Sequence, residues 1–145
     1  MKIFDRNDSG RQHRADMYLP LWLLIFSISL NLGALASALY AIATAQWFIF
    51  IITAIAAGFG IAAFLCWKNQ KIILLDNSRF EYTTFLGKTT VYYFSQIREL
   101  KRNSDSFTLL VGDGKVHIES CAIISDELLQ KIDEALSKNI FSEKL

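Results

Sequence analysis

Two histidines and two cysteines are the residues whose chemistry could serve metal binding or catalysis. His13 lies in a polar N-terminal segment, and His117 lies on a predicted strand. Zinc sites need ligands at short, regular spacings, and no such spacing joins either histidine to a cysteine or to the other histidine. Cys66 and Cys121 are separated by most of the predicted C-terminal domain, so we predict two free thiols, as suits a reducing compartment.

Motifs that mark enzymes are missing from the sequence. It contains no Gly-x-Ser-x-Gly, His-Glu-x-x-His, phosphate-cradling glycine loop or Cys-x-x-Cys. We therefore predict that the protein is not an enzyme and uses no cofactor, metal or small-molecule substrate. Residues 69–145 carry ten basic and eleven acidic side chains, a balance that disfavours nucleic acid as a partner.

The element that must organise the chain is the run from Met17 to Trp67, which has no Asp, Glu, Lys, Arg or His. A bilayer core of roughly 30 Å needs about 20 apolar helical residues, so the run suffices for two crossings and is too short for three. We predict a helical hairpin over residues 17–67, with crossings at about 19–42 and 47–67. The lipid bilayer is then the first partner of the protein.

The charges that flank this run predict its orientation. Basic residues precede the first crossing and follow the second, whereas the hairpin tip is uncharged, so both termini should be cytoplasmic. Residues 1–16 should form a mobile tail. A cleaved signal peptide is the alternative, because Ala34, Ala36 and Ala38 offer small-x-small cleavage sites. Cleavage there would leave a long apolar remainder that still needs a membrane.

Small residues recur every four positions in both crossings. Gly33 and Ser37 lie on one stripe of the first helix, and Ala54 and Gly58 on one stripe of the second. Helices in lipid associate by close packing of such residues. The stripes predict either closure of the hairpin on itself or homo-oligomerisation.

Residues 68–145 change to a period of two, which predicts short antiparallel strands with tight turns, one of them at Asp113-Gly114. A helix should follow over about 126–138, capped by Ser125. The predicted fold class is a membrane α-helical hairpin plus an α+β domain. The α+β domain is expected to be a small antiparallel β-barrel or curled sheet of 5–7 strands, capped by the C-terminal helix.

This order of parts resembles the bacterial proteins in which two transmembrane helices precede a pleckstrin-homology-like domain. The resemblance covers about residues 17–140 and depends on the apolar pair, the stretch KIILLDNSRFEYTTFLGKTTVYYFSQIRELKR, the Asp-Gly hairpin and the closing helix. It implies a partly open β-barrel closed by the helix, at the bacterial inner membrane. Many relatives hold phosphoinositides in the first strand-to-strand loop, but the corresponding loop here, residues 76–79, has one basic and one acidic residue.

The sequence is compatible with three functions. The first is a membrane-anchored binding or assembly module that presents its β domain to a protein partner. The second is an accessory subunit of a membrane transport or lipid-handling complex. The third is a sensor of anionic lipid headgroups, for which Arg98, Lys101 and Arg102 are the candidate contacts.

Overall fold

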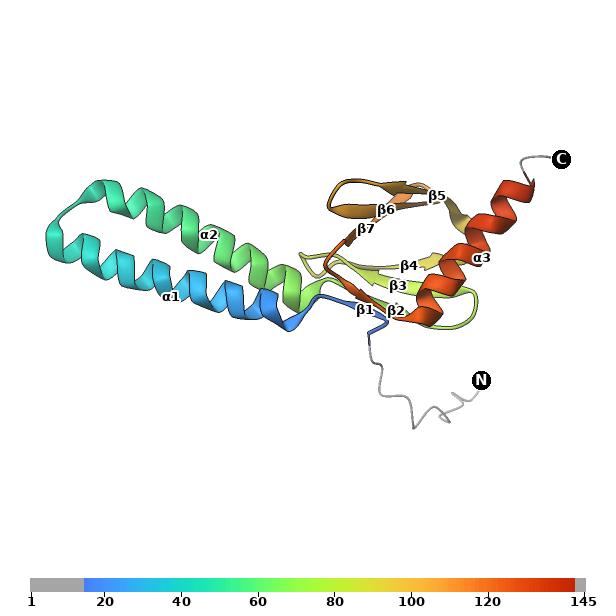
Figure 1. The fold of residues 1–145 in the computed structure, drawn as a ribbon, viewed down its shortest axis with the longest axis horizontal. Helices are drawn as coiled ribbons and strands as arrows, with labels where there is room; N and C mark the ends of the chain where they lie inside the picture. The colour runs from blue at the N-terminus through green and yellow to red at the C-terminus, as the bar shows by residue number, and fades with distance from the viewer. Residues whose placement is uncertain (1–14, 143–145) are drawn as a thin grey trace, which may run out of the picture.

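The computed structural model describes residues 15–142 and shows a long helical hairpin attached to a β domain (Figure 1). The hairpin consists of α1 (Leu21–Thr44) and α2 (Trp47–Asn69), so the two predicted crossings are confirmed as helices to within two or three residues. Both are long and apolar enough to span a membrane. Pro20 precedes α1 as its N-cap, where its missing N–H costs no helical hydrogen bond.

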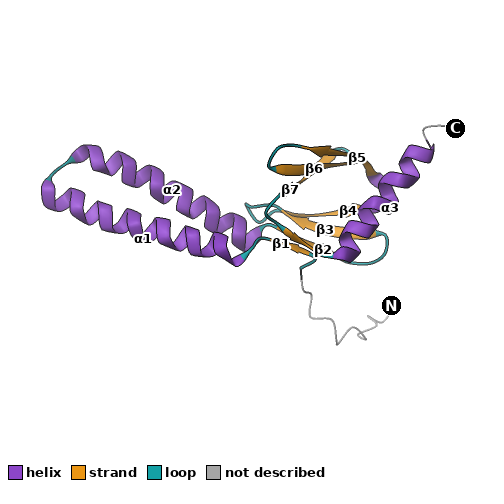
Figure 2. Cartoon of the chain, in the orientation of Figure 1, coloured by secondary structure: helices purple, strands orange, loops and turns teal. Residues whose placement is uncertain are grey.

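The β domain contains two antiparallel sheets and a C-terminal helix (Figure 2). The first sheet has the order β4-β3-β2-β1-β8, and the second has the order β5-β6-β7. The strands are β1 (Met17–Tyr18), β2 (Lys71–Leu74), β3 (Arg79–Thr83), β4 (Thr89–Tyr93), β5 (Ile97–Arg102), β6 (Ser106–Val111), β7 (Gly114–Glu119) and β8 (Ile123–Ile124).

The strand β1 was not anticipated. Met17 and Tyr18, which the sequence placed at the start of the hairpin, lie between β2 and β8 and pair with both. Asp16, assigned by sequence to the tail, donates its N–H to Ile72 O (2.8 Å) and accepts from Ser125 N at its carbonyl (2.7 Å). The boundary between tail and hairpin therefore moves, because the chain contributes to the sheet before it enters α1. The rest of the predicted tail, residues 1–14, lies outside the described residues.

The hairpin is consequently an insertion between two neighbouring strands. Tyr18 pairs with Lys71, and Met17 pairs with Ile72, so α1 and α2 form the connection of an antiparallel β1–β2 pair. The links are short: Leu19 and Pro20 lead into α1, and Gln70 alone separates α2 from β2. Leu19 and Gln70 are both buried. The hairpin and the β domain thus meet through two short, packed joints.

The two sheets do not close into a barrel, so the prediction of a closed β-barrel is wrong. The helix α3 (Asp126–Ser142) packs instead against β5 and the 3₁₀ turn η1 (Phe94–Gln96) that joins β4 to β5. Its buried side chains Leu128 and Ile132 belong to the same core as Met17, Ile72 and residues of both sheets. The helix fills the opening that strand pairing would have to close in a barrel.

Candidate functional site

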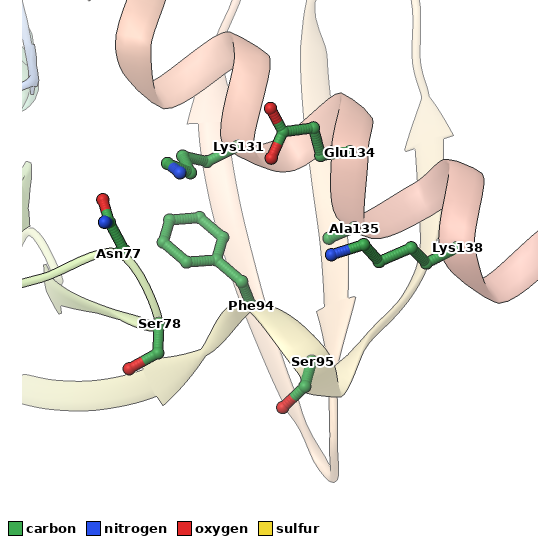
Figure 3. A pocket seen from close by; sticks show the side chains of 8 residues that line it. All are labelled: Asn77, Ser78, Phe94, Ser95, Lys131, Glu134, Ala135 and Lys138. Atoms are coloured by element: carbon green, nitrogen blue, oxygen red, sulfur yellow. The ribbon is translucent and has the colours of Figure 1, made fainter.

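A cleft lies between α3 and two turns of the β domain (Figure 3). Figure 1 shows α3 at the end of the β domain away from the hairpin. Its volume is about 290 Å³. The buried ring of Phe94 forms part of its wall, and polar side chains surround the opening. The residues that line the cleft are Asn77, Ser78, Phe94, Ser95, Lys131, Glu134, Ala135 and Lys138.

The helix α3 supplies the charged side of the cleft. Ser125 caps the helix, since its Oγ accepts from Leu128 N (3.2 Å), and Leu128 and Ile132 anchor it in the core. Lys131 and Lys138 are seven residues apart, so they project from one side of α3 at nearly the same angle. Figure 3 shows both side chains directed along the cleft around Phe94.

The opposite wall is a turn held by Asp76. The Asp76 carboxylate accepts from Ser78 N (2.8 Å), Ser78 Oγ (2.6 Å) and Arg79 N (2.9 Å), and it pairs with the Arg79 guanidinium. The hydrogen bonds from Ser78 and Arg79, together with the Arg79 charge, hold the pKa of Asp76 well below its ordinary value. Ser78 O in turn accepts from Phe94 N (2.9 Å). The turn and the wall of the cleft are therefore fixed to each other.

The cleft can bind an anionic group. Two ammonium groups and the hydroxyl of Ser95 are donors, whereas the hydroxyl of Ser78 already donates to Asp76 and Glu134 accepts a hydrogen bond from Gln130 Nε2 (3.0 Å). One carboxylate among two lysines leaves the lining with a net positive charge. A carboxylate is one anion whose charge this lining complements.

A second candidate surface is the hairpin itself. Ser27 is buried and its Oγ donates to Gly60 O (2.8 Å), while Ser37 Oγ and Thr53 Oγ1 are 2.6 Å apart. A Cβ at Gly60 would stand 2.9 Å from Asn31 Cγ and closer still to the amide nitrogen of that side chain. These contacts include one stripe residue, Ser37, and lie otherwise at Ser27, Asn31 and Gly60, outside the stripes at four-residue spacing.

The predicted packing residues separate into two groups. Ser37 faces α2 through its bond to Thr53. Gly33, Ala54 and Gly58 are exposed, and a Cβ added at either glycine would meet nothing within 4 Å. Gly33 lines a shallow apolar groove between the helices, with a volume of about 310 Å³. The small residues at these three positions are therefore not required for closing the hairpin.

The predicted cationic cluster is spread over β5. Lys101 is opposite Thr108 and Arg102 is opposite Phe107, so the two side chains project from opposite faces of the sheet. Lys101 lies 3.9 Å from Glu99, and the Arg102 guanidinium stacks over the ring of Phe107 at 5.5 Å. Arg98 falls at the register irregularity between Ile97 and Glu99. The strand does not bring the three cations together around one headgroup.

His117 contacts a carboxylate and a hydroxyl on the exposed face of its own sheet. The exposed His117 ring lies 3.2 Å from Glu119 and 3.4 Å from Thr108 Oγ1. Cys66 and Cys121 are both free thiols. Within residues 15–142, no group of three or more His, Cys, Asp and Glu side chains could hold a metal ion.

Known proteins give no further guide. Comparison with known protein families, with characterised proteins and with solved structures finds no match for this chain. The geometry of the site is therefore the basis for inferring its chemistry.

Sequence reasoning missed the cleft, because its lining comes from three segments that only the fold brings together. Asn77 and Ser78 belong to the turn after β2, Ser95 to η1, and Lys131 and Lys138 to α3. The spacing of the two lysines was visible in the sequence. The turn at residues 76–79 was also predicted, but nothing in the sequence indicated that it would lie beside the 3₁₀ segment and α3.

Proposed function

We propose that this protein is a membrane-anchored binding module. Its hairpin spans the bacterial inner membrane twice, both termini are cytoplasmic, and the β domain presents its outer cleft to a protein partner. The observation that carries the proposal is the insertion of α1 and α2 between the paired strands β1 and β2. In this proposal the end of the β domain that joins the hairpin faces the membrane, and the cleft at the other end faces the cytoplasm.

The surface of the hairpin supports a lipid environment. Large apolar side chains are exposed along both helices, among them Leu32, Ile51 and Phe59, each more than half exposed. Little of either helix is covered by the rest of the protein. In water this would be a far larger apolar surface than soluble monomers expose, whereas in lipid it is the expected surface.

The signal-peptide alternative fits the fold poorly. Cleavage after Ala36 would remove β1 from its place between β2 and β8 and would leave Gly60 without Ser27, the serine that contacts it. Retention of α1 keeps both the sheet and the hairpin intact. The orientation follows from Lys68 at the end of α2 and from the basic flanks noted in the sequence.

The pleckstrin-homology-like identity is part of this proposal. Two antiparallel sheets followed by a helix that covers the gap between them support it. In this proposal the β domain works through the cleft beside α3. The partner contributes an acidic side chain to Lys131 and Lys138, with its backbone along η1.

A cross-linking experiment tests the proposal. A photoreactive residue replaces Ser95 in the full-length protein, and cross-linked species are collected from inner membranes after extraction with mild detergent. We expect one defined adduct, lost in a Lys131→Glu, Lys138→Glu variant and retained in Lys115→Glu, which changes an exposed lysine on β7. An adduct that survives the double charge reversal, or recovery of the monomer alone, would contradict the proposal.

The hairpin surface favours a second function, that of an accessory subunit in a membrane transport or lipid-handling complex. Gly33, Ala54 and Gly58 leave open space on the outside of the hairpin, where another helix can approach closely. Gly58→Leu should then abolish the complex, and Ile55→Leu, a change at an exposed large residue nearby, should not. If the complex persists in Gly58→Leu, this version fails. A dimer that depends on Gly58 would indicate homo-oligomerisation instead.

A further inference from the structure

The turn between β3 and β4 exposes two large apolar side chains next to the hairpin. Phe85 is 45% exposed and Leu86 is 72% exposed, although both belong to a well-formed turn. The turn is closed by a bond from Thr84 N to Lys88 O (2.9 Å) and another from Gly87 N to Thr84 O (2.8 Å). Gly87 has φ +84°, a conformation that a side chain would disfavour. The exposure is thus a fixed feature of the fold.

This turn is attached to the end of α2. Asn69 Nδ2 donates to Phe85 O (2.8 Å), and Figure 1 shows the turn at the end of the sheet that faces the hairpin. Asn69 is two residues beyond Trp67, which corresponds to about 3 Å along a helix axis. Tryptophan at the end of a membrane-spanning helix prefers the headgroup level. The turn therefore lies within a few ångströms of the level at which the apolar part of α2 ends.

We infer that Phe85 and Leu86 insert into the interfacial layer of the bilayer that the hairpin spans. The inference rests on the proposed membrane function and adds a third point of membrane contact, separate from α1 and α2. Continuity with the apolar surface of the hairpin identifies lipid as the occupant, because the turn and the last turn of α2 are joined directly. Three points of contact fix the tilt of the β domain, which two adjacent helix ends cannot do alone.

The charges around the turn suit the same surface. Lys68 and Lys88 are exposed on either side of Asn69 and Phe85. Ammonium groups at this level interact favourably with phosphates and with anionic headgroups. Glu119, at the same end of the domain, is engaged by His117 at 3.2 Å. An apolar tip between two lysines is the combination expected for an interfacial contact.

Fluorescence quenching in lipid tests the inference. The full chain is needed, because β1 and β2 flank the hairpin and the β domain is not a continuous segment. In a background with Cys66→Ala and Cys121→Ser, single cysteines at Leu86, Asp113 and Ile52 carry the same environment-sensitive dye. Each protein is reconstituted in phosphatidylcholine–phosphatidylglycerol vesicles with or without nitroxide-labelled lipid. Asp113 is the matched control, since it occupies an exposed turn of the β6–β7 hairpin.

We expect a blue shift and loss of emission with nitroxide lipid at Leu86 and Ile52, and neither at Asp113. Quenching at Ile52 but not at Leu86 would overturn this inference and leave the membrane function standing. No quenching at Ile52 would remove the membrane function itself. A blue shift at Leu86 without quenching, accompanied by cross-linking of two chains through that cysteine, would assign the turn to a contact between copies and would also overturn the inference.

Discussion

The contact between Asn31 on α1 and Gly60 on α2 gives a prediction about the stability of the hairpin. In Gly60→Ala the added Cβ would meet the Asn31 side chain at 2.9 Å from Cγ, which is too close for a stable contact. Either Asn31 moves, which breaks the bond from its Nδ2 to Ser27 O (2.8 Å), or the helices separate, which stretches the bond from Ser27 Oγ to Gly60 O (2.8 Å).

The magnitude follows from these losses. An interhelical hydrogen bond in a membrane contributes about 0.6 to 1.7 kcal/mol, and overpacking costs about 1 to 3 kcal/mol. The gain in helix propensity from glycine to alanine offsets about 1 kcal/mol. We expect Gly60→Ala to destabilise the closed hairpin by about 2 kcal/mol. Gly58→Ala, with open space around its Cβ, should be neutral or slightly stabilising.

Energy transfer across the hairpin can measure this difference. A tryptophan at the exposed position Leu35 is the only donor after Trp22→Phe, Trp47→Phe and Trp67→Phe, and an acceptor is attached to a cysteine at the exposed position Ile55 after Cys66→Ala and Cys121→Ser. Increasing the mole fraction of a denaturing detergent opens the hairpin, and the midpoints give the free energies of opening.

A double-mutant cycle then separates the clash from other effects. Asn31→Ala combined with Gly60→Ala should recover at least half of the loss, because the side chain that the new Cβ meets is gone. Equal midpoints for Gly60→Ala and Gly58→Ala would refute this account of the helix contact. So would the absence of any recovery in the double variant.

Three further predictions concern the β domain. Asp16→Ala should lower the free energy of unfolding in detergent by about 2 kcal/mol, since Leu74 N loses its carboxylate acceptor; an unchanged midpoint in denaturant would exclude this role. The pKa of Asp76 should lie well below the ordinary aspartate value of about 3.9. The contribution of Asp76 to stability is then present above about pH 4 and is lost as the pH falls through the lowered pKa. A carboxyl resonance of Asp76 that titrates near 3.9 would contradict the turn geometry. Replacing residues 19–70 by Asn-Gly should give a folded, water-soluble β domain with dispersed amide resonances, whereas residues 71–145 alone should be markedly less stable because β1 is missing.

The hairpin could be predicted from sequence because the absence of charge over so long a run leaves few alternatives. The helix α3 and the turn between β6 and β7 had equally local signals, an amphipathic stripe and an Asp-Gly step. The strand β1 had none. It has two residues, too few for a period of two, and Met17 is apolar like the helix that follows, so only pairing with β2 and β8 reveals it.

The site was less predictable than the fold. Gly33, Gly58 and Gly60 look alike in the sequence, and which of them contacts the other helix depends on how α1 and α2 are rotated against each other. Hydrogen bonds from Ser27 and Ser37 to residues of α2 fix this rotation, and these bonds join positions that are distant in the sequence. In the same way Arg98, Lys101 and Arg102 are neighbours in sequence, but strand alternation and the irregular register separate them.

The position of β1 also dictates the order in which the chain can be assembled. The two strands that pair with β1 are synthesised much later, β2 after both helices and β8 near the end of the chain. Met17 and Tyr18 therefore have no strand to pair with until then. If either helix failed to enter the bilayer, the first residues would be held on the wrong side or at the wrong distance from β2. In the proposed membrane topology, completion of the sheet therefore requires that both helices have been inserted, and an incomplete sheet would leave part of the core exposed.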